Sequence, residues 1–361
     1  MKPPQQLHDL GQSLWLDNIT RDLLTSGTLK RYIDELSVTG LTSNPTIFDH
    51  AIKNTNYYDD AIREKVDVGK QGEELFFELA LEDLRQAADL FRPIFEQTNR
   101  MDGWVSLEVS PHLAYEPAST LAEARKLHAQ ANRPNLFIKI PGTQAGLHAI
   151  EVATFEGVPV NVTLLFSREQ YLAAAGAYLR GIERRIAAGL NPDVTSVASL
   201  FISRWDKATM GRAPRWLQNR LGIAVAQRTY QAYHEVLNSA RWLRLANEGA
   251  RPQRLLWAST GTKDPDASDY MYVKALAAPL TINTMPEETL HAFADHGTLA
   301  AMLPPDGGHS DQVIAQFAAA GITYDALADE LQREGAAAFV KSWDDLLTVV
   351  AEKSGALVQP A

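Results

Sequence analysis

The sequence contains no cysteine among its 361 residues. This absence excludes disulfide bonds, thiolate metal sites and cysteine nucleophiles. Basic residues are also in the minority, since 34 Lys and Arg against 44 Asp and Glu give a formal net charge of -10. An acidic surface argues against a general binder of nucleic acid or of anionic membranes, although it is compatible with local basic sites for small phosphates.

Long hydrophobic runs are missing as well. No stretch approaches the roughly 20 apolar residues that span a bilayer. The first six residues lack the apolar core of a signal peptide, so we expect a cytoplasmic protein with neither a membrane nor a nucleic acid as partner. Hydrophobic residues make up 45% of the chain, which is enough for a large core.

Short apolar runs alternate with longer helical patterns from one end of the sequence to the other. The runs that we interpret as strands are 14–17, 40–43, 104–109, 136–140, 158–163, 195–201, 255–259 and 280–283. Strands that are each followed by a helix predict parallel pairing, and the economical solution is an α/β fold, an eight-stranded (β/α)8 TIM barrel. An open doubly wound sheet is the alternative, but the first run is not followed by the glycine-rich phosphate turn that favours it.

Local patterns also predict where helices lie. Apolar spacing predicts a helix over 72–96, and capping boxes predict helix starts at Thr120, Ser167 and Thr284. The chain exceeds the roughly 250 residues of a plain barrel. We assign the excess to a helical insertion at about 205–253 and a C-terminal helical segment at about 310–361, both packed on a single domain over 1–361.

One apolar run carries a charge in its middle. Lys139 lies within 136–140, and Pro141 and Gly142 end that run. Removing an ammonium group from water is costly, so burial favours a neutral amine that can attack a carbonyl carbon. The simpler interpretation is a lysine at a strand end whose head group reaches solvent.

Polar residues gather at the predicted strand ends, where barrels of this kind carry their chemistry. The set comprises Asp17, Asn44, Glu108, Lys139, Asn161, Thr163, Ser199, Arg204, Ser259 and Lys263. Taken singly, Asp17 or Ser259 could cap a helix. Taken together, the set instead fits an amine nucleophile with acid and base partners and a site that binds an anion. It contains two carboxylates, a buried lysine and two further cations at successive strand ends.

Other chemistries find little support in the sequence. No two of the nine histidines lie at metal-ligand spacing on a strand end. A Walker loop and a nucleophile-elbow serine are both absent. We therefore expect no metal and no cofactor.

Seven segments carry a resemblance to the transaldolase family of class I Schiff-base aldolases, and in particular to its longer bacterial form. They run in family order through 16–18, 40–46, 106–109, 137–141, 161–167, 196–204 and 257–265. The resemblance implies an eight-stranded α/β barrel. It also implies transfer of a dihydroxyacetone unit from sedoheptulose 7-phosphate or fructose 6-phosphate to glyceraldehyde 3-phosphate or erythrose 4-phosphate, in the non-oxidative pentose phosphate pathway.

The resemblance implies catalytic roles for four residues. Lys139 corresponds to the lysine that forms the Schiff base. Glu108 and Thr163 correspond to residues that hold a catalytic water while the carbinolamine forms and dehydrates. Asp17 corresponds to the carboxylate that shuttles a proton at the sugar hydroxyl.

The resemblance also implies substrate contacts. These are Asn44, Asn161 and Ser199 for the dihydroxyacetone unit, Arg204 and Ser259 for the phosphate, and Phe201 for an aromatic wall. Shorter relatives have an arginine after the seventh strand, where this chain has Lys263 preceded by two inserted residues, Gly261 and Thr262. Lysine binds phosphate as a point charge and not bidentately, so Lys263 is a weaker candidate than Arg204.

Two other functions stay open at this point. A lyase similar to fructose-6-phosphate aldolase would release free dihydroxyacetone, but Phe201 in place of a tyrosine and the long chain argue against it. The second alternative is a non-catalytic barrel that binds a sugar phosphate. The joint presence of Asp17, Glu108 and Lys139 argues against this alternative. In each case the partners are small sugar phosphates, and we expect a monomer or a homodimer.

Overall fold

The computed structural model describes residues 1–358, and its strands all run parallel in one sheet. The strands are β1 Ser13–Leu16, β2 Val38–Leu41, β3 Val105–Glu108, β4 Leu136–Pro141, β5 Val160–Leu165, β6 Ser196–Phe201, β7 Gln253–Ala258 and β8 Ile282–Met285. Their order is β2-β1-β8-β7-β6-β5-β4-β3, and a bridge between Gly40 and Trp104 joins the two edges. The predicted (β/α)8 barrel is therefore confirmed, and each predicted strand overlaps an observed one.

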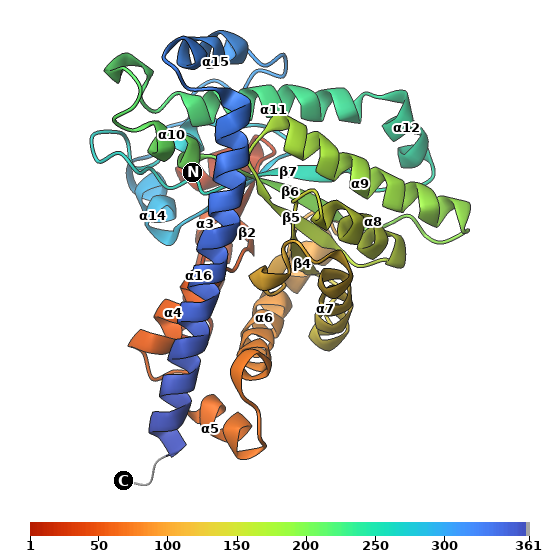
Figure 1. Cartoon of the computed structure of the whole chain (residues 1–361), viewed down its shortest axis with the longest axis vertical. Helices are drawn as coiled ribbons and strands as arrows, with labels where there is room; N and C mark the ends of the chain where they lie inside the picture. Colours follow the sequence, from red (N-terminus) through yellow and green to blue (C-terminus); the bar gives the residue numbers. More distant parts are fainter. Residues whose placement is uncertain (359–361) are drawn as a thin grey trace.

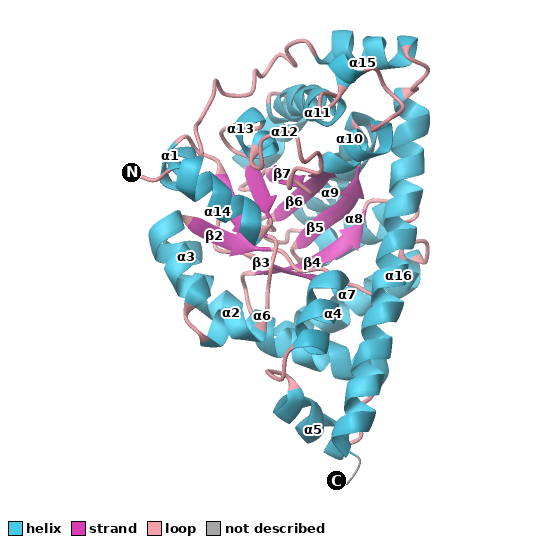
Figure 2. Cartoon of the chain, turned by 90° about the vertical axis from the view of Figure 1, so that its left-hand side faces the viewer, coloured by secondary structure: helices cyan, strands magenta, loops and turns pink. Residues whose placement is uncertain are grey.

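Helices surround this barrel (Figure 2). They are α1 Pro3–Asp9, α2 Arg21–Thr25, α3 Thr28–Leu36, α4 Pro45–Asn54, α5 Asp59–Asp67, α6 Gly72–Gln97, α7 Pro117–Ala131, α8 Gly146–Glu156, α9 Arg168–Ala187, α10 Ser203–Thr209, α11 Leu221–Leu237, α12 Ala240–Asn247, α13 Met271–Ala275, α14 Glu287–His296, α15 Ser310–Ala319 and α16 Tyr324–Val358. The strands are buried along their whole length because helices cover the barrel, which is why they appear in the sequence as continuous apolar runs. The helix predicted over 72–96 is α6.

One predicted capping box is confirmed and two are wrong. The Ser167 hydroxyl accepts from the backbone N–H of Gln170 at 3.1 Å and opens α9. By contrast, α7 begins at Pro117, since proline suits the first helical position, and the Thr120 hydroxyl donates to a backbone carbonyl instead. Thr284 lies within β8, and α14 begins three residues later.

The region predicted as an insertion, about 205–253, connects β6 to β7. It contains most of α10 together with α11 and α12, and α11 packs against α9 and α15. One continuous hydrophobic cluster extends from Leu7 to Val350. The organisation of 1–361 as a single domain stays a prediction.

The long helix α16 lies alongside the barrel and reaches from α10 to α5 (Figure 1). Gln332 holds it to the ends of two strands, because its amide donates to the carbonyl oxygens of Gly142 at 3.2 Å and Leu164 at 3.0 Å. Farther along, the Trp343 indole donates to the Glu73 carboxylate of α6 at 2.9 Å. These contacts place the middle of α16 at the C-terminal ends of β4 and β5.

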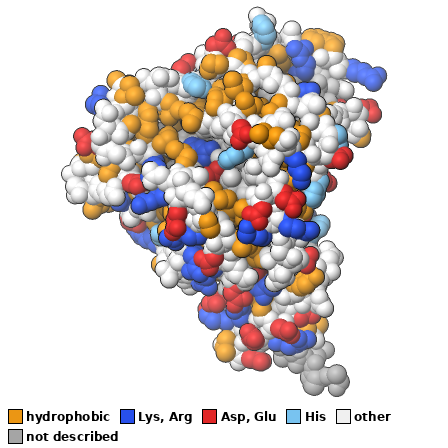
Figure 3. All heavy atoms as spheres, turned by 180° about the vertical axis from the view of Figure 1, so that it is seen from behind, with side chains coloured by type: hydrophobic (Ala, Val, Ile, Leu, Met, Phe, Trp, Pro, Cys, Tyr) orange, Lys and Arg blue, Asp and Glu red, His pale blue; other side chains and the backbone are white. Residues whose placement is uncertain are grey.

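Charges of both signs are mixed on the face opposite to that of Figure 1 (Figure 3). Ion pairs such as Lys65–Glu82 and Arg63–Asp60 form at the end of the molecule that holds α5. No helix among residues 1–358 combines the length and the apolar character that crossing a membrane requires.

We predict that the barrel closure depends on Gly40. A Cβ atom there would lie 2.6 Å from the carbonyl oxygen of Trp104 and 2.6 Å from the indole nitrogen of Trp15. Gly40→Ala should therefore lower the free energy of unfolding by about 1–3 kcal/mol, measured by urea denaturation. Gly176→Ala in α9 is the control, because the added methyl would meet only the flexible Arg180 side chain. Equal stabilities of the two variants would contradict the prediction.

Candidate active site

Lys139 lies at the centre of the site because β4 carries it into the barrel. The side chain is only 6% exposed, which excludes the interpretation of a head group that reaches solvent. Its amine donates to the carbonyl oxygen of Ser43 at 3.0 Å and lies 3.1 Å from Oε2 of Glu108. Glu108 and Lys139 are opposite each other in the register of β3 and β4, so the pairing of these strands brings the carboxylate to the amine.

Two carboxyl groups lie near this amine, and burial acts on both. Burial raises the pKa of Glu108, and the opposing charge of Lys139 only partly offsets it. Burial likewise raises the pKa of Asp17, against the opposing effects of Lys139 and of the hydrogen bond that Thr42 donates at 2.9 Å. A carboxyl group with a raised pKa exchanges a proton more readily near neutral pH, as acid and base catalysis requires.

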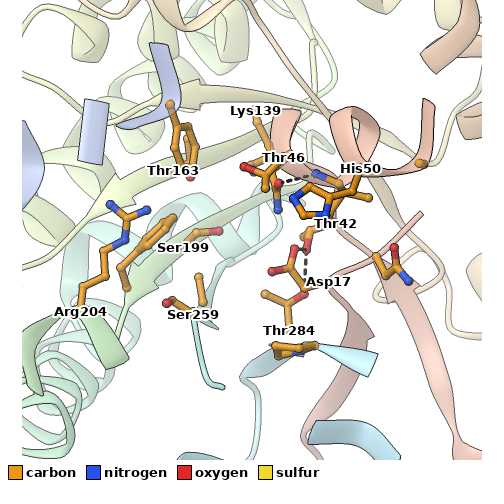
Figure 4. A pocket seen from close by; sticks show the side chains of 18 of the residues that line it. Asp17, Thr42, Thr46, His50, Lys139, Thr163, Ser199, Arg204, Ser259 and Thr284 are labelled. Carbon is orange, nitrogen blue, oxygen red and sulfur yellow. Dashed lines mark hydrogen bonds between the residues drawn. The ribbon is translucent and has the colours of Figure 1, made fainter. Parts of the chain in front are cut away.

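A cavity of about 630 Å³ opens over Lys139 at the C-terminal ends of the strands (Figure 4). The predicted residues that line it are Asp17, Asn44, Lys139, Thr163, Ser199, Phe201, Arg204 and Ser259. The structure therefore brings most of the predicted site together from separate strands. Glu108, Asn161 and Lys263 are not part of this lining.

Asn161 lies beneath the cavity in full burial. Its amide donates to the Ser106 hydroxyl at 3.1 Å and accepts from the Ser199 hydroxyl at 2.7 Å. These bonds orient Ser199, which lines the cavity. Lys263 is exposed on the loop after β7, yet its charge lowers the pKa of Asp17 as a minor effect.

Asn44 has two tasks in the structure. Its side-chain oxygen accepts from the backbone N–H of Ile47 at 3.1 Å and caps α4, while the residue also lines the cavity. A hydrogen bond from Asn44 stabilises the charged form of Asp17 and so opposes the rise of its pKa. The cap fixes the side chain that faces the substrate space.

Two buried polar groups near the amine lack hydrogen-bond partners among residues 1–358. They are the Thr163 hydroxyl and the Glu108 carboxylate. The Glu108 carboxylate lies 3.1 Å from the Lys139 amine, which is close enough for an ion pair, but the two groups are poorly aligned for a hydrogen bond. Buried polar groups in proteins are nearly always paired with protein or with water. Both groups are therefore available to a ligand or to a water molecule.

On another side of the cavity lies a cation that forms no direct ion pair within residues 1–358, although the charge of Glu334 partly offsets the effect of burial on its pKa. The Arg204 guanidinium makes neither a hydrogen bond nor an ion pair within residues 1–358, and burial lowers its pKa. Its central carbon lies 5.5 Å from the ring centroid of Phe201 and 5.9 Å from that of Phe339. Nearby, the hydroxyl groups of Ser259 and Ser203 share a hydrogen bond of 2.8 Å. A cation and a hydroxyl group facing one cavity suit an anion.

The chain matches the family model described as Transaldolase/Fructose-6-phosphate aldolase over residues 14–350. It is 45% identical to the transaldolase of Thermobifida fusca (strain YX), covering 98% of this chain and 99% of that protein. It is 45% identical to the transaldolase of Saccharopolyspora erythraea, with 97% of each chain covered, and 43% identical to that of Thiobacillus denitrificans, with 94% and 97% covered.

The chain belongs to the transaldolase/fructose-6-phosphate aldolase family. The resemblance drawn from the seven segments is thus confirmed over nearly the whole chain. Together with the names of the relatives, it supports a transferase.

Sequence reasoning missed several residues that line the cavity. Thr42 could have been predicted, because it lies in the segment 40–46 and two residues before Asn44. Asn18 follows Asp17 directly, and its amide donates to Glu287 of α14 at 2.9 Å. No sequence pattern indicated that Phe339 lines the cavity, since it belongs to α16 and is far along the chain from every strand. Among residues 1–358, no three His, Asp or Glu side chains are grouped so that they could hold a metal ion.

We predict that Asp17 lowers the stability of the protein at neutral pH. Because its pKa in the folded state is raised above the ordinary value of 3.8, the unfolded chain ionises first, and stability falls as pH rises through this window. Asp17→Asn should therefore unfold at a higher temperature than the native protein at pH 7. The difference in unfolding temperature between Asp17→Asn and the native protein should become smaller as the pH falls towards 3.8.

The control for this prediction is Asp266→Asn, at an exposed aspartate. It should leave the unfolding temperature unchanged at both pH values. A lower stability of Asp17→Asn at pH 7 would show that the attraction to Lys139 outweighs the cost of burying the carboxylate.

Proposed function

We propose that this protein transfers a dihydroxyacetone unit from sedoheptulose 7-phosphate or fructose 6-phosphate to an aldose phosphate, through a Schiff base on Lys139. The observation that carries the proposal is the buried amine of Lys139 with Glu108 at 3.1 Å and Asp17 nearby, in one cavity at the C-terminal face of the barrel. Family membership and full-length relatives named transaldolase support it.

The first step is attack of the neutral Lys139 amine on the carbonyl carbon of the ketose. Glu108 is the base that takes the proton of the ammonium group, since it is adjacent and its pKa is raised. The resulting carbinolamine loses water and becomes an iminium ion. We assign Glu108 and Thr163, both buried without hydrogen-bond partners, to the water molecule involved.

The second step breaks the carbon–carbon bond. Asp17 takes the proton from the substrate hydroxyl beside that bond, the O–H electrons form the carbonyl of the departing aldehyde, and the bonding pair moves into the iminium ion. The three-carbon unit stays on Lys139 as an enamine. Addition to the acceptor aldehyde reverses these steps, and Asp17 returns its proton to the new hydroxyl group.

The substrate contacts follow from the two sides of the cavity. We assign Asn44 and Ser199, with Asn161 behind Ser199, to the hydroxyl groups of the dihydroxyacetone unit. The phosphate contacts are Arg204 and Ser259, with Phe201 as a wall and Lys263 as a weaker contact. A volume of about 630 Å³ lies within the range of small-molecule sites.

We also propose that the protein acts in the cytoplasm, where phosphorylated sugars are held by their charge. The proposal requires only small sugar phosphates as partners. The expectation of a monomer or a homodimer stays a prediction.

Borohydride trapping with fructose 6-phosphate, followed by peptide mass mapping, tests the nucleophile. We expect one reduced adduct, on the peptide that contains Lys139. Lys139→Ala should lose the adduct and reduce transfer by about 10⁴-fold or more, as removal of a covalent nucleophile does. Lys126→Ala, at an exposed lysine, is the matched control and should behave like the native protein. A folded protein that forms no adduct, beside a control enzyme that does, would favour the non-catalytic sugar-phosphate-binding barrel.

The phosphate assignment is tested by comparing two cations. Arg204→Ala should raise KM for fructose 6-phosphate by about 10- to 100-fold, because it removes a charged hydrogen-bond donor from a partly buried site. Lys263→Ala, at an exposed position, should change KM by no more than about fivefold. Unphosphorylated fructose should be insensitive to both changes. Equal losses with phosphorylated and unphosphorylated donors would contradict a phosphate role for Arg204.

A further inference from the structure

One residue of the cavity comes neither from a strand nor from a loop that follows one. Phe339 belongs to α16, which follows all eight strands in the chain. It is half-buried, and its ring packs against the hydrophobic core while one part faces the cavity. The proposed catalytic steps make no use of it.

The ring of Phe339 lies close to both functional cations of the site. Its centroid is 5.9 Å from the amine nitrogen of Lys139 and 5.9 Å from the central carbon of the Arg204 guanidinium. Phe201 lies next to it, with 6.3 Å between ring centroids at an angle of 62°. The guanidinium, which forms no direct ion pair within residues 1–358, thus lies near two aromatic rings.

The position of this ring is fixed by the helix that bears it. One turn before Phe339, Gly335 allows α16 to approach the barrel closely, since a Cβ there would lie 3.1 Å from Leu164 and 3.3 Å from Arg204. The hydrogen bonds of Gln332 to the ends of β4 and β5 hold the same part of the helix. These contacts hold the helix backbone next to Phe339 against the barrel, and the ring of Phe339 forms one wall of the cavity.

We propose that Phe339 decides between transfer and hydrolysis by keeping water from the enamine on Lys139, and that it also orients Arg204. This inference rests on the proposed function. Hydrolysis requires a proton on the enamine carbon, then addition of water to the iminium carbon and expulsion of the Lys139 amine, which releases dihydroxyacetone. The apolar ring occupies one side of the cavity, 5.9 Å from the amine nitrogen, and offers no hydrogen bond that would hold a water molecule on that side for these steps.

The ring has a second effect on the phosphate contact. A guanidinium near aromatic faces is stabilised by cation–π attraction and held in a narrow range of orientations. Phe339 therefore positions Arg204 for the phosphate of the donor. The two effects are separable, because an aliphatic side chain excludes water but offers no aromatic face.

The test measures dihydroxyacetone released and dihydroxyacetone transferred, with fructose 6-phosphate as donor and erythrose 4-phosphate as acceptor. Phe339→Ala should raise the ratio of release to transfer by about tenfold or more, because it opens the amine to water. Phe339→Leu should keep that ratio close to the native one. It should instead raise KM for fructose 6-phosphate by about threefold, with no change for unphosphorylated fructose.

Val340→Ala is the matched control, since Val340 is the next residue of the same helix and half-buried but does not line the cavity. It should leave both the ratio and KM at native values, with any loss of stability read from thermal unfolding. A native ratio in Phe339→Ala, in a protein that is folded and forms the borohydride adduct, would overturn the inference. Absence of the adduct in the native protein would instead overturn the proposed function, so the two failures are distinguishable.

Discussion

The structure depends on an amine held out of water in the middle of a barrel. An ammonium group in such a place is costly unless a counter-charge and hydrogen bonds accompany it. Glu108 supplies the charge from the neighbouring strand, and the Ser43 carbonyl supplies an acceptor. Glu108 lies on the strand next to that of Lys139, and Ser43 lies two residues after the end of β2. The pairing of β3 with β4 therefore sets the position of the carboxylate beside the amine.

Burial also changes the proton affinity of the carboxyl groups in this arrangement. The apolar surroundings that stabilise the barrel also raise the pKa of Glu108 and of Asp17, which suits both groups to the proton transfers that we propose. The polar layer beneath the cavity, in which Ser106, Asn161 and Ser199 are linked in a chain, keeps the cavity floor in one arrangement. Burying Glu108 and Asp17 therefore lowers the stability of the fold, while the proposed function requires both groups to be buried.

The strands were predictable because parallel strands buried on both faces need continuous apolar runs, and Lys139 was conspicuous within such a run. The polar residues at the strand ends followed from the rule that barrels collect them on one face. Contacts across long separations could not be predicted in this way. The capping box at Thr284 was wrong because pairing of β8 with β1 extends that strand past the threonine. Phe339 was missed because its helix is placed by tertiary contacts alone.

The order of the elements along the chain has a consequence for biosynthesis. Since α16 follows all eight strands, a chain that is still being made on the ribosome can pair its strands and enclose the Lys139 amine before Phe339 has been added. Phe339 is therefore the last of the residues that line the cavity to be synthesised, after every strand of the barrel.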